Sequence, residues 1–344
     1  MHVTLVTPAD KRSRSGNRTT AARWAAILRD LGHRVRTTQA YQGGATDLLL
    51  ALHAWRSAAS IARFRERHPH RPLIVGLGGT DVYRFLASDP PTVLRSLELA
   101  DALVGLHDLV GAAIPARFRD KLVVIHQSAR PLRRRDPQRP RGFDVLVIGH
   151  LREEKDPLRA AEAARRLPAA SRIRVLHLGR ALDASWADRA RAEMAANPRY
   201  RWLGEAPNWQ VRRALARAPL MVLSSRMEGG ANVISEAVVA GVPLLASRIP
   251  GNVGLLGRDY PGYFSPEDTD ALARLMLRAE TEPKFLATLR RACAARAPLF
   301  DPGRERAAWH ALLDRMQNQR DRLGRIAARQ DAANGRRPRE AERV

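Results

Sequence analysis

Two glutamates in the second half of the chain, Glu228 and Glu236, have the spacing expected of a site for a phosphorylated sugar. The apolar run 220–223 is typical of a buried strand, the glycine pair 229–230 of a tight loop, and residues 231–240 of a helix. A helix that begins after glycines presents unpaired backbone N–H groups and the positive end of its dipole, which together bind anions. Glu236 is placed roughly 8 Å along that helix, where a carboxylate can reach a sugar hydroxyl beyond a phosphate. A solvated loop glutamate and a surface helical glutamate would have the same spacing.

A second polar cluster follows the first apolar run of the chain. Residues 7–20 form a loop that leads into a helix, and the loop is rich in cations, hydroxyls and one glycine. This composition favours an anionic ligand at a helix N-terminus, although a solvated loop in an arginine-rich protein would look similar. The stretch 78–81, Gly-Gly-Thr-Asp, follows another apolar run, and either substrate positioning or turn chemistry accounts for it. His53 also ends an apolar run, where a lone histidine is more often packed than catalytic.

Short apolar runs alternate with helical patterns through both halves, which predicts α/β architecture with parallel sheets covered on both faces. We expect strands at 3–7, 35–38, 47–52, 73–77, 102–106 and 122–125, and again at 144–148, 174–178, 200–203, 220–223 and 244–246. The segment 128–142 carries three prolines and six arginines, which is typical of a linker. The predicted organisation is a first domain over 1–130, a linker over 131–142, a second domain over 143–300, a helix over 301–316 and a disordered basic tail over 317–344.

Composition limits the possible functions. The net charge is +24, but arginine supplies nearly all of it and aromatic residues make up only 5%, which argues against a base-stacking nucleic-acid platform. The single cysteine, Cys293, excludes an intramolecular disulfide and fits a reducing compartment. No secretory segment opens the chain and no apolar run has membrane-spanning length. A cytoplasmic protein without integral membrane association is expected, and no cluster with metal-ligand spacing is seen.

Residues 144–300 resemble the nucleotide-sugar domain of the retaining glycosyltransferases with the GT-B fold, in which two Rossmann-like domains face each other across a cleft. Glu228 and Glu236 match the Glu-x7-Glu motif of this family, and residues 144–156 resemble its Gly-Arg-Leu-x-x-x-Lys segment. Lys155 occupies the lysine position, whereas His150 stands at the arginine position and Arg152 is the cation that can replace it. The resemblance implies a UDP-sugar donor, no metal or other cofactor, and a last helix that crosses back onto the first domain.

To about residue 316, the chain is also similar to the selenosugar synthases of bacterial selenoneine biosynthesis, on residues 15–20, 78–81 and 228–232. This implies transfer of a sugar from UDP-N-acetylglucosamine or UDP-glucose to selenophosphate, with formation of a C–Se bond and release of UDP and phosphate. An anionic selenium nucleophile needs little base assistance, which fits the lack of an evident general base in the first domain. The implied catalytic residues are Glu228, Lys155 and Arg152; the donor-binding residues are His150, Gly229, Gly230, Asn232, Val233 and Glu236; and the acceptor-binding residues are Lys11, Arg12, Gly16, Asn17, Arg18, Thr19, Thr80 and Asp81.

Three other functions fit the same pattern. An ordinary glycosyltransferase acting on a lipid or polysaccharide precursor would present an apolar groove or a basic amphipathic helix near the first domain, and residues 52–67 have such a pattern. A UDP-sugar epimerase would leave the cationic first loop without a purpose. A binding protein without catalytic activity would bind UDP-sugar and turn nothing over.

Overall fold

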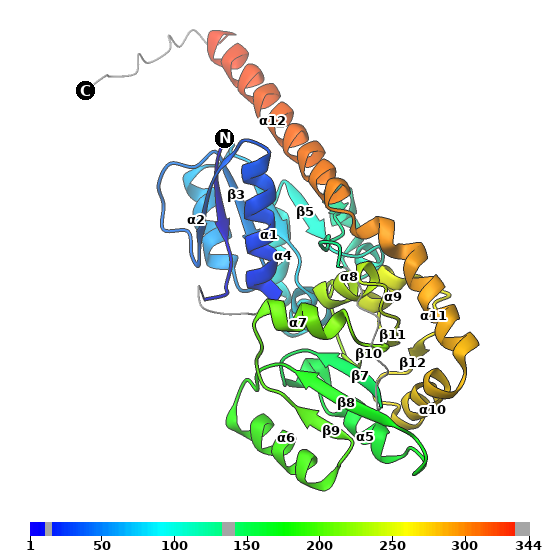
Figure 1. Cartoon of the computed structure of the whole chain (residues 1–344). Coiled ribbons are helices and arrows are strands. Elements are labelled where there is room, and N and C mark those ends of the chain that lie inside the picture. The colour runs from blue at the N-terminus through cyan, green and yellow to red at the C-terminus, as the bar shows by residue number, and fades with distance from the viewer. Residues whose placement is uncertain (11–15, 133–141, 334–344) are drawn as a thin grey trace.

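The computed structural model describes residues 1–10, 16–132 and 142–333, with side chains described as far as residue 318. It contains two six-stranded parallel sheets. The first has the order β2 (Arg34–Thr38), β1 (His2–Val6), β3 (Leu48–Leu52), β4 (Leu73–Gly76), β5 (Ala102–Gly105) and β6 (Leu122–Val124), and the second has the order β12 (Tyr263–Phe264), β11 (Leu244–Ser247), β10 (Leu220–Leu223), β7 (Phe143–Ile148), β8 (Ile173–Leu178) and β9 (Tyr200–Trp202). Helices cover both faces of each sheet, and the two domains lie one above the other in Figure 1. This is the α/β arrangement predicted from the alternation of apolar runs and helical patterns.

The first domain is built around a sheet whose central strands are wholly buried. All five residues of β3 (Leu48–Leu52) are buried, and β3 pairs in register with β1 on one side and β4 on the other. Helix α1 packs Trp24 and Leu28 onto this sheet. The elements are β1 His2–Val6, α1 Gly16–Asp30, β2 Arg34–Thr38, β3, α2 Ala58–Arg67, β4 Leu73–Gly76, η1 Asp81–Phe85, α3 Leu86–Ser88, α4 Pro90–Leu99, β5 Ala102–Gly105, η2 Val110–Ala112, η3 Ala116–Lys121 and β6 Leu122–Val124.

In the second domain, the loops that follow β7 and β10 lie side by side. Strands β7 and β10 are neighbours, with Leu220 opposite Val145 and Val222 opposite Val147, although their loops are far apart in sequence. The chain order of the strands reverses between these two, and ligands bind α/β sheets at such a point, beyond the carboxyl ends of the strands. The elements are β7 Phe143–Ile148, η4 Glu153–Lys155, α5 Arg159–Arg165, β8 Ile173–Leu178, α6 Ala184–Ala196, β9 Tyr200–Trp202, α7 Asn208–Leu215, β10 Leu220–Leu223, α8 Asn232–Val239, β11 Leu244–Ser247, α9 Pro250–Leu256, β12 Tyr263–Phe264, α10 Thr269–Thr281, α11 Pro283–Arg296 and η5 Ala297–Phe300.

The last helix, α12 (Pro302–Ala333), joins the two domains. Trp309, Leu313 and Met316 are buried in the core of the first domain, and Trp309 meets Trp24 edge-on with ring centroids 4.7 Å apart. Figure 1 shows α12 running along the first domain and beyond it. The sequence predicts disorder from Gln317, whereas the structure has helix to Ala333.

Helix α2 does not offer the amphipathic surface that a lipid acceptor would need. Ile61 and Phe64 are fully buried against the first sheet, and Ser60 bonds to the backbone N–H of Tyr41. The apolar stripe predicted over 52–67 is therefore core packing. No helix of the described residues is long and apolar enough to cross a membrane.

Candidate functional site

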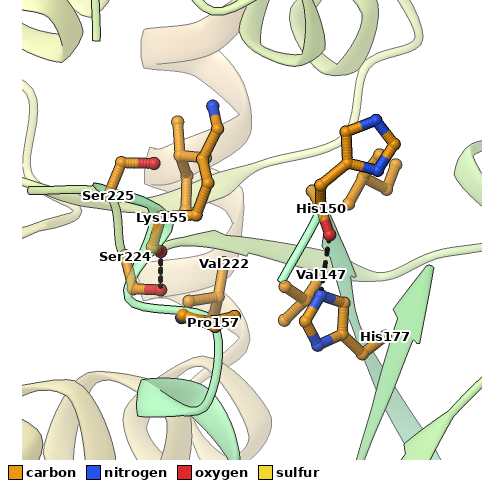
Figure 2. Close-up of a pocket in the computed structure, with 11 residues that line it drawn as sticks. Val147, His150, Lys155, Pro157, His177, Val222, Ser224 and Ser225 are labelled. Carbon is orange, nitrogen blue, oxygen red and sulfur yellow. Dashed lines mark hydrogen bonds between the residues drawn. The ribbon is translucent and has the colours of Figure 1, made fainter. Parts of the chain in front are cut away.

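The centre of the site is an ion pair between the two loops that follow β7 and β10. Lys155 Nζ lies 2.5 Å from Glu228 Oε1, and Ser225 Oγ donates to the same carboxylate oxygen at 2.6 Å. Only 18% of the lysine side chain and 9% of the glutamate side chain are exposed. Figure 2 shows Lys155 and His150 extending to the same side of the strand ends, with Ser225 beside Lys155. A cation and a carboxylate at this point can together hold a charged, hydroxylated ligand.

Serine side chains fix the loop that carries Lys155. Ser224 Oγ donates to the carbonyl oxygens of Lys155 and Asp156, at 3.3 and 2.8 Å. Asp156 ends the short helix η4 with a φ of 44°, in the left-handed region that few non-glycine residues adopt. Ser247 Oγ in turn donates to the carbonyl of Ser225 at 2.5 Å. Ser224 therefore fixes the backbone that carries Lys155, and Ser247 fixes the loop that carries Glu228.

The glycine pair and the N-terminus of α8 lie directly against the first domain. A Cβ at Gly229 would lie 2.2 Å from the backbone nitrogen of Gly79, and one at Gly230 would lie 2.4 Å from Leu106 Cβ. Only residues without a side chain allow this approach. Helix α8 begins at Asn232 after Ala231, which supplies no side-chain cap, so its first N–H groups are suited to an anion.

A partly buried arginine of the first domain reaches this helix terminus. Arg23 Nη1 donates to Asn232 Oδ1 at 2.6 Å and to Gln127 Oε1 at 3.1 Å. Burial lowers the pKa of Arg23, and the carboxylates of Glu305 and Glu236 oppose that shift. Burial raises the pKa of Glu236, and Arg23 and Arg212 oppose it. Glu236 and the side chain of Asn232 are thus coupled electrostatically to the first domain.

Sequence reasoning missed Arg23, and one signal was available. Arg23 lies three positions after Thr20 on α1, so both face the same way along the helix. Thr20 is buried, and Gln127 Nε2 donates to its hydroxyl at 2.9 Å. A polar pair at this spacing on an otherwise apolar helix face indicates a polar partner in the fold.

His150 follows a strand end that is held in place by a second histidine, the buried His177. His150 Nδ1 accepts a hydrogen bond from the backbone N–H of Arg180 at 3.2 Å. His177 lies on the other side of the strand ends in Figure 2, where Nε2 is 3.0 Å from the carbonyl oxygen of Gly149 and Nδ1 is 3.0 Å from Tyr200 Oη. The Gly149 carbonyl can only accept, so we assign the proton of His177 to Nε2. His177 fixes the end of β7, and desolvation lowers its pKa to about 4.

Acidification is expected to destabilise the protein through its buried neutral histidines. Desolvation lowers the pKa of both His177 and His107 from 6.5 to about 4. The unfolded chain binds these protons first as pH falls below 6.5, so stability is complete above that value and is lost towards pH 4. Each histidine should remove about 2 kcal/mol between pH 7 and pH 5. Chemical denaturation of His177→Gln should show a smaller loss over this range, whereas His70→Gln at an exposed position should match the wild type.

The third predicted catalytic residue, Arg152, lies beside an ion pair that joins the two domains. Its Nε lies 3.9 Å from Glu154 Oε2, and Glu154 accepts a hydrogen bond from Arg84 of the first domain at 2.8 Å. The structure thus brings Lys155 to Glu228 and places Arg152 in an interdomain charge cluster. The backbone N–H of Arg226 donates to the Glu154 carbonyl at 2.9 Å, which ties this cluster to residues 224–231, the β10–α8 loop.

The predicted acceptor-binding residues separate into three groups. Lys11 and Arg12 lie outside the described residues. Gly16, Asn17, Arg18 and Thr19 form the exposed or partly exposed first turn of α1. Thr80 is partly exposed next to Gly79, which contacts the β10–α8 loop, whereas Asp81 is wholly buried. A direct contact between Asp81 and an acceptor does not fit this burial, because its carboxylate accepts from the backbone N–H groups of Ala54, Trp55 and Gly78.

His53 is packed, as a lone histidine at a strand end usually is, but it is also paired. Its Nδ1 lies 2.5 Å from Asp81 Oδ1 and its Nε2 lies 2.7 Å from Thr80 Oγ1. No general base in the first domain was evident from the sequence, and the His53–Asp81 pair is a candidate for one. Among the residues that the structure describes, no group of three or more His, Cys, Asp or Glu side chains is placed to hold a metal ion.

Comparisons with known protein sequences show what part of this chain is similar to. Residues 130–298 match the family model described as glycosyl transferases group 1. Over 111 residues the chain is 33% identical to TuaC of Bacillus subtilis (strain 168), assigned as a teichuronic acid biosynthesis glycosyltransferase. That match covers 31% of this chain and 28% of TuaC.

Solved structures match almost the whole chain. Anabaena HepE in complex with UDP and glucose superposes with a TM-score of 0.73 at 15% identity, over 91% of this chain and 99% of HepE. Sucrose-phosphate synthase from Thermosynechococcus elongatus gives a TM-score of 0.71 at 16% identity, over 96% of this chain and 99% of that one. At such identities the likeness establishes the fold. Residues 130–298 therefore match the glycosyl transferases group 1 model, and the chain has the GT-B fold.

Proposed function

We propose that the protein transfers a sugar from a UDP-sugar to selenophosphate. The C–Se bond forms as the bond between the anomeric carbon and the diphosphate breaks, and UDP leaves with the electron pair. Water then cleaves the Se–P bond and releases phosphate. The observation that carries the donor half of this proposal is the Lys155–Glu228 pair beside the N-terminus of α8.

The donor half uses charge that is already in place. A leaving diphosphate gains negative charge as the glycosidic bond breaks, and a fixed ammonium group and helix N–H groups stabilise that charge without reorganisation. Lys155 and the N–H groups of Asn232 and Val233 are the candidates for this task, with Arg152 as a further cation. Glu228 would hold a sugar hydroxyl and Glu236 the ribose. HepE has been solved with UDP-glucose bound, which supports a UDP-sugar as donor.

The acceptor half rests on the first turn of α1 and on the resemblance to selenosugar synthases. This turn has no acidic residue and carries Arg18 beside Asn17 and Thr19. A guanidinium group suits bidentate recognition of phosphate oxygens. A small polyanion would therefore be held between the two domains, in a cleft from which water is excluded.

A saccharide hydroxyl is the second candidate acceptor. The likeness to TuaC, a protein assigned to teichuronic acid biosynthesis, favours it. This candidate shares the donor site and needs a group that takes the proton of the attacking hydroxyl.

Two measurements test the two halves separately. Isothermal titration with UDP should give a dissociation constant that rises at least tenfold in Glu236→Ala, because the ribose contact is lost. Anaerobic incubation with selenophosphate and UDP-N-acetylglucosamine or UDP-glucose should give a selenium-containing sugar by mass spectrometry, absent in Arg18→Ala. UDP binding without a selenium product would retain the donor site and replace selenophosphate by a hydroxyl acceptor, whereas failure to bind UDP would overturn the donor site.

A further inference from the structure

Three side chains that follow the carboxyl ends of β3 and β4 form a continuous series of hydrogen bonds. Asp81 Oδ1 lies 2.5 Å from His53 Nδ1, and His53 Nε2 lies 2.7 Å from Thr80 Oγ1. Asp81 is fully buried, His53 is 3% exposed, and Thr80 is partly exposed. This series of hydrogen bonds therefore runs from the interior towards the surface, and the hydroxyl group of Thr80 is at its outer end.

The backbone around this chain holds the groups in place. His53 has a φ of 75°, in the left-handed region, where a non-glycine residue is strained and is kept only by its surroundings. The backbone N–H of Ala54 donates to Asp81 Oδ2 at 2.9 Å, and that of Trp55 donates to Oδ1 at 2.9 Å. The strained turn after β3 thus aims the imidazole and supplies donors to the carboxylate together.

Hydrogen bonding assigns the protons along the chain. A carboxylate that accepts backbone N–H groups on both oxygens is in its acceptor-only form, so the proton in the short contact with His53 belongs to Nδ1. Nε2 is then an acceptor, and Thr80 donates to it. The backbone N–H of Arg56 also lies 3.2 Å from Nδ1, and the shorter carboxylate contact decides the tautomer. Thr80 Oγ1 keeps lone pairs that can receive a proton from another molecule.

Thr80, at the outer end of this series of hydrogen bonds, lies next to a contact with the β10–α8 loop. A Cβ at Gly79, next to Thr80, would lie 2.4 Å from the backbone nitrogen of Gly229 and 2.7 Å from the carbonyl carbon of Glu228. Near its C-terminal end, η1 also contacts the second domain, where Arg84 donates to Glu154. Thr80 is therefore one residue from the contact between the two domains at the proposed sugar site.

We propose that Thr80, His53 and Asp81 form a proton relay that takes the proton of an attacking acceptor, a proposal that rests on the glycosyl transfer proposed above. The acceptor atom, oxygen or selenium, forms its bond to the anomeric carbon as the bond to the diphosphate breaks. Its proton passes to Thr80 Oγ1 while the hydroxyl proton of Thr80 passes to His53 Nε2. The resulting imidazolium is balanced by the Asp81 carboxylate. Thr80 is the residue that touches the acceptor, and His53 and Asp81 act through it.

The relay implies an acceptor that still carries its proton when it binds, either a hydroxyl group or protonated selenophosphate. Activity assays on Thr80→Val, Thr80→Ser and His53→Gln would use UDP-glucose with water, glycerol or selenophosphate as the acceptor. We expect UDP release to fall about 100-fold in Thr80→Val and His53→Gln and less than threefold in Thr80→Ser. The affinity for UDP should stay within twofold in all three, because the relay does not hold the donor. Thr281→Val, an exposed threonine on α10, is the matched control.

Nitrogen NMR of the imidazole groups tests the proposed proton relay when no acceptor is present. In the full-length protein at pH 7.5, the signal lost in His53→Gln should show a protonated Nδ1 and an unprotonated Nε2 that shifts in Thr80→Val. A protonated Nε2, or an Nε2 signal unchanged in Thr80→Val, would overturn the relay even if UDP binding is intact. A selenium product with equal rates in Thr80→Val and wild type would show that selenophosphate reacts without it and would also overturn the relay. Loss of UDP binding in the wild type would count against the donor site alone.

Discussion

Lys155→Met is expected to lower the rate of UDP release about 10²–10³-fold, the usual effect of removing one preorganised group from the site of developing charge. The ammonium group lies 2.5 Å from Glu228 and is largely buried with it, so no solvent cation can replace it readily. Because the diphosphate gains charge as the glycosidic bond breaks, the rate should fall far more than the affinity for UDP. Initial rates at saturating UDP-glucose and titration with UDP measure these two quantities.

The control for this substitution is Lys284→Met, which removes an exposed lysine at the start of α11. It should leave both the rate and the affinity unchanged. If Lys155→Met weakened UDP binding as much as it slowed release, the lysine would act in ground-state binding and the leaving-group role would be wrong.

The fold was predictable because its signals are local. Each segment that was expected to be a strand overlaps a strand of the structure, and the run 48–52 forms the wholly buried centre of the first sheet. The strand that the sequence did not indicate, Tyr263–Phe264, has two residues and pairs only with β11. Periodicity over so short a segment carries no information. The helix from Gln317 to Ala333 was not predicted either, because its polar sequence has no apolar face.

The residues of the proposed donor site were predicted as a set, but their arrangement was not. Sequence reasoning placed Lys155 and Glu228 around one ligand, and it did not foresee that they contact each other. That contact depends on β7 and β10 being neighbours, which is a property of the topology. Ser225, which bonds to the same carboxylate, was missed for the same reason. Arg23 was missed because its one local signal, the spacing from Thr20, gains meaning only once Thr20 is known to be buried.

Asp81 shows a further limit of sequence reasoning. The Gly-Gly-Thr-Asp stretch was correctly placed at a strand end, but its two polar side chains point in different directions. Asp81 turns inward because backbone N–H groups of Ala54 and Gly78 require an acceptor, and Thr80 remains partly exposed. The backbone of the turn after β3 determines which of the two side chains is buried, so residue spacing in the sequence could not predict it.

Gly79→Ala is expected to reduce UDP release by about 10²-fold or more while both domains stay folded. The new Cβ would lie 2.4 Å from the backbone nitrogen of Gly229, and backbone atoms can make room only if the two domains separate. A displacement of about 1 Å at reacting groups costs roughly 10²-fold in rate. Initial rates and circular dichroism would measure the effect on activity and on folding.

Gly229→Ala should have the same effect, because its Cβ would lie 2.2 Å from the backbone nitrogen of Gly79. Gly303→Ala is the control, since its Cβ would meet only the end of the Asp301 side chain, at 2.9 Å. If one interdomain contact is responsible, the double variant should be little worse than either single one, because the first substitution already opens the gap that the second needs. Fully additive losses would mean that the two glycines act at separate places, and wild-type activity in Gly79→Ala would mean that catalysis does not require the domains to meet here.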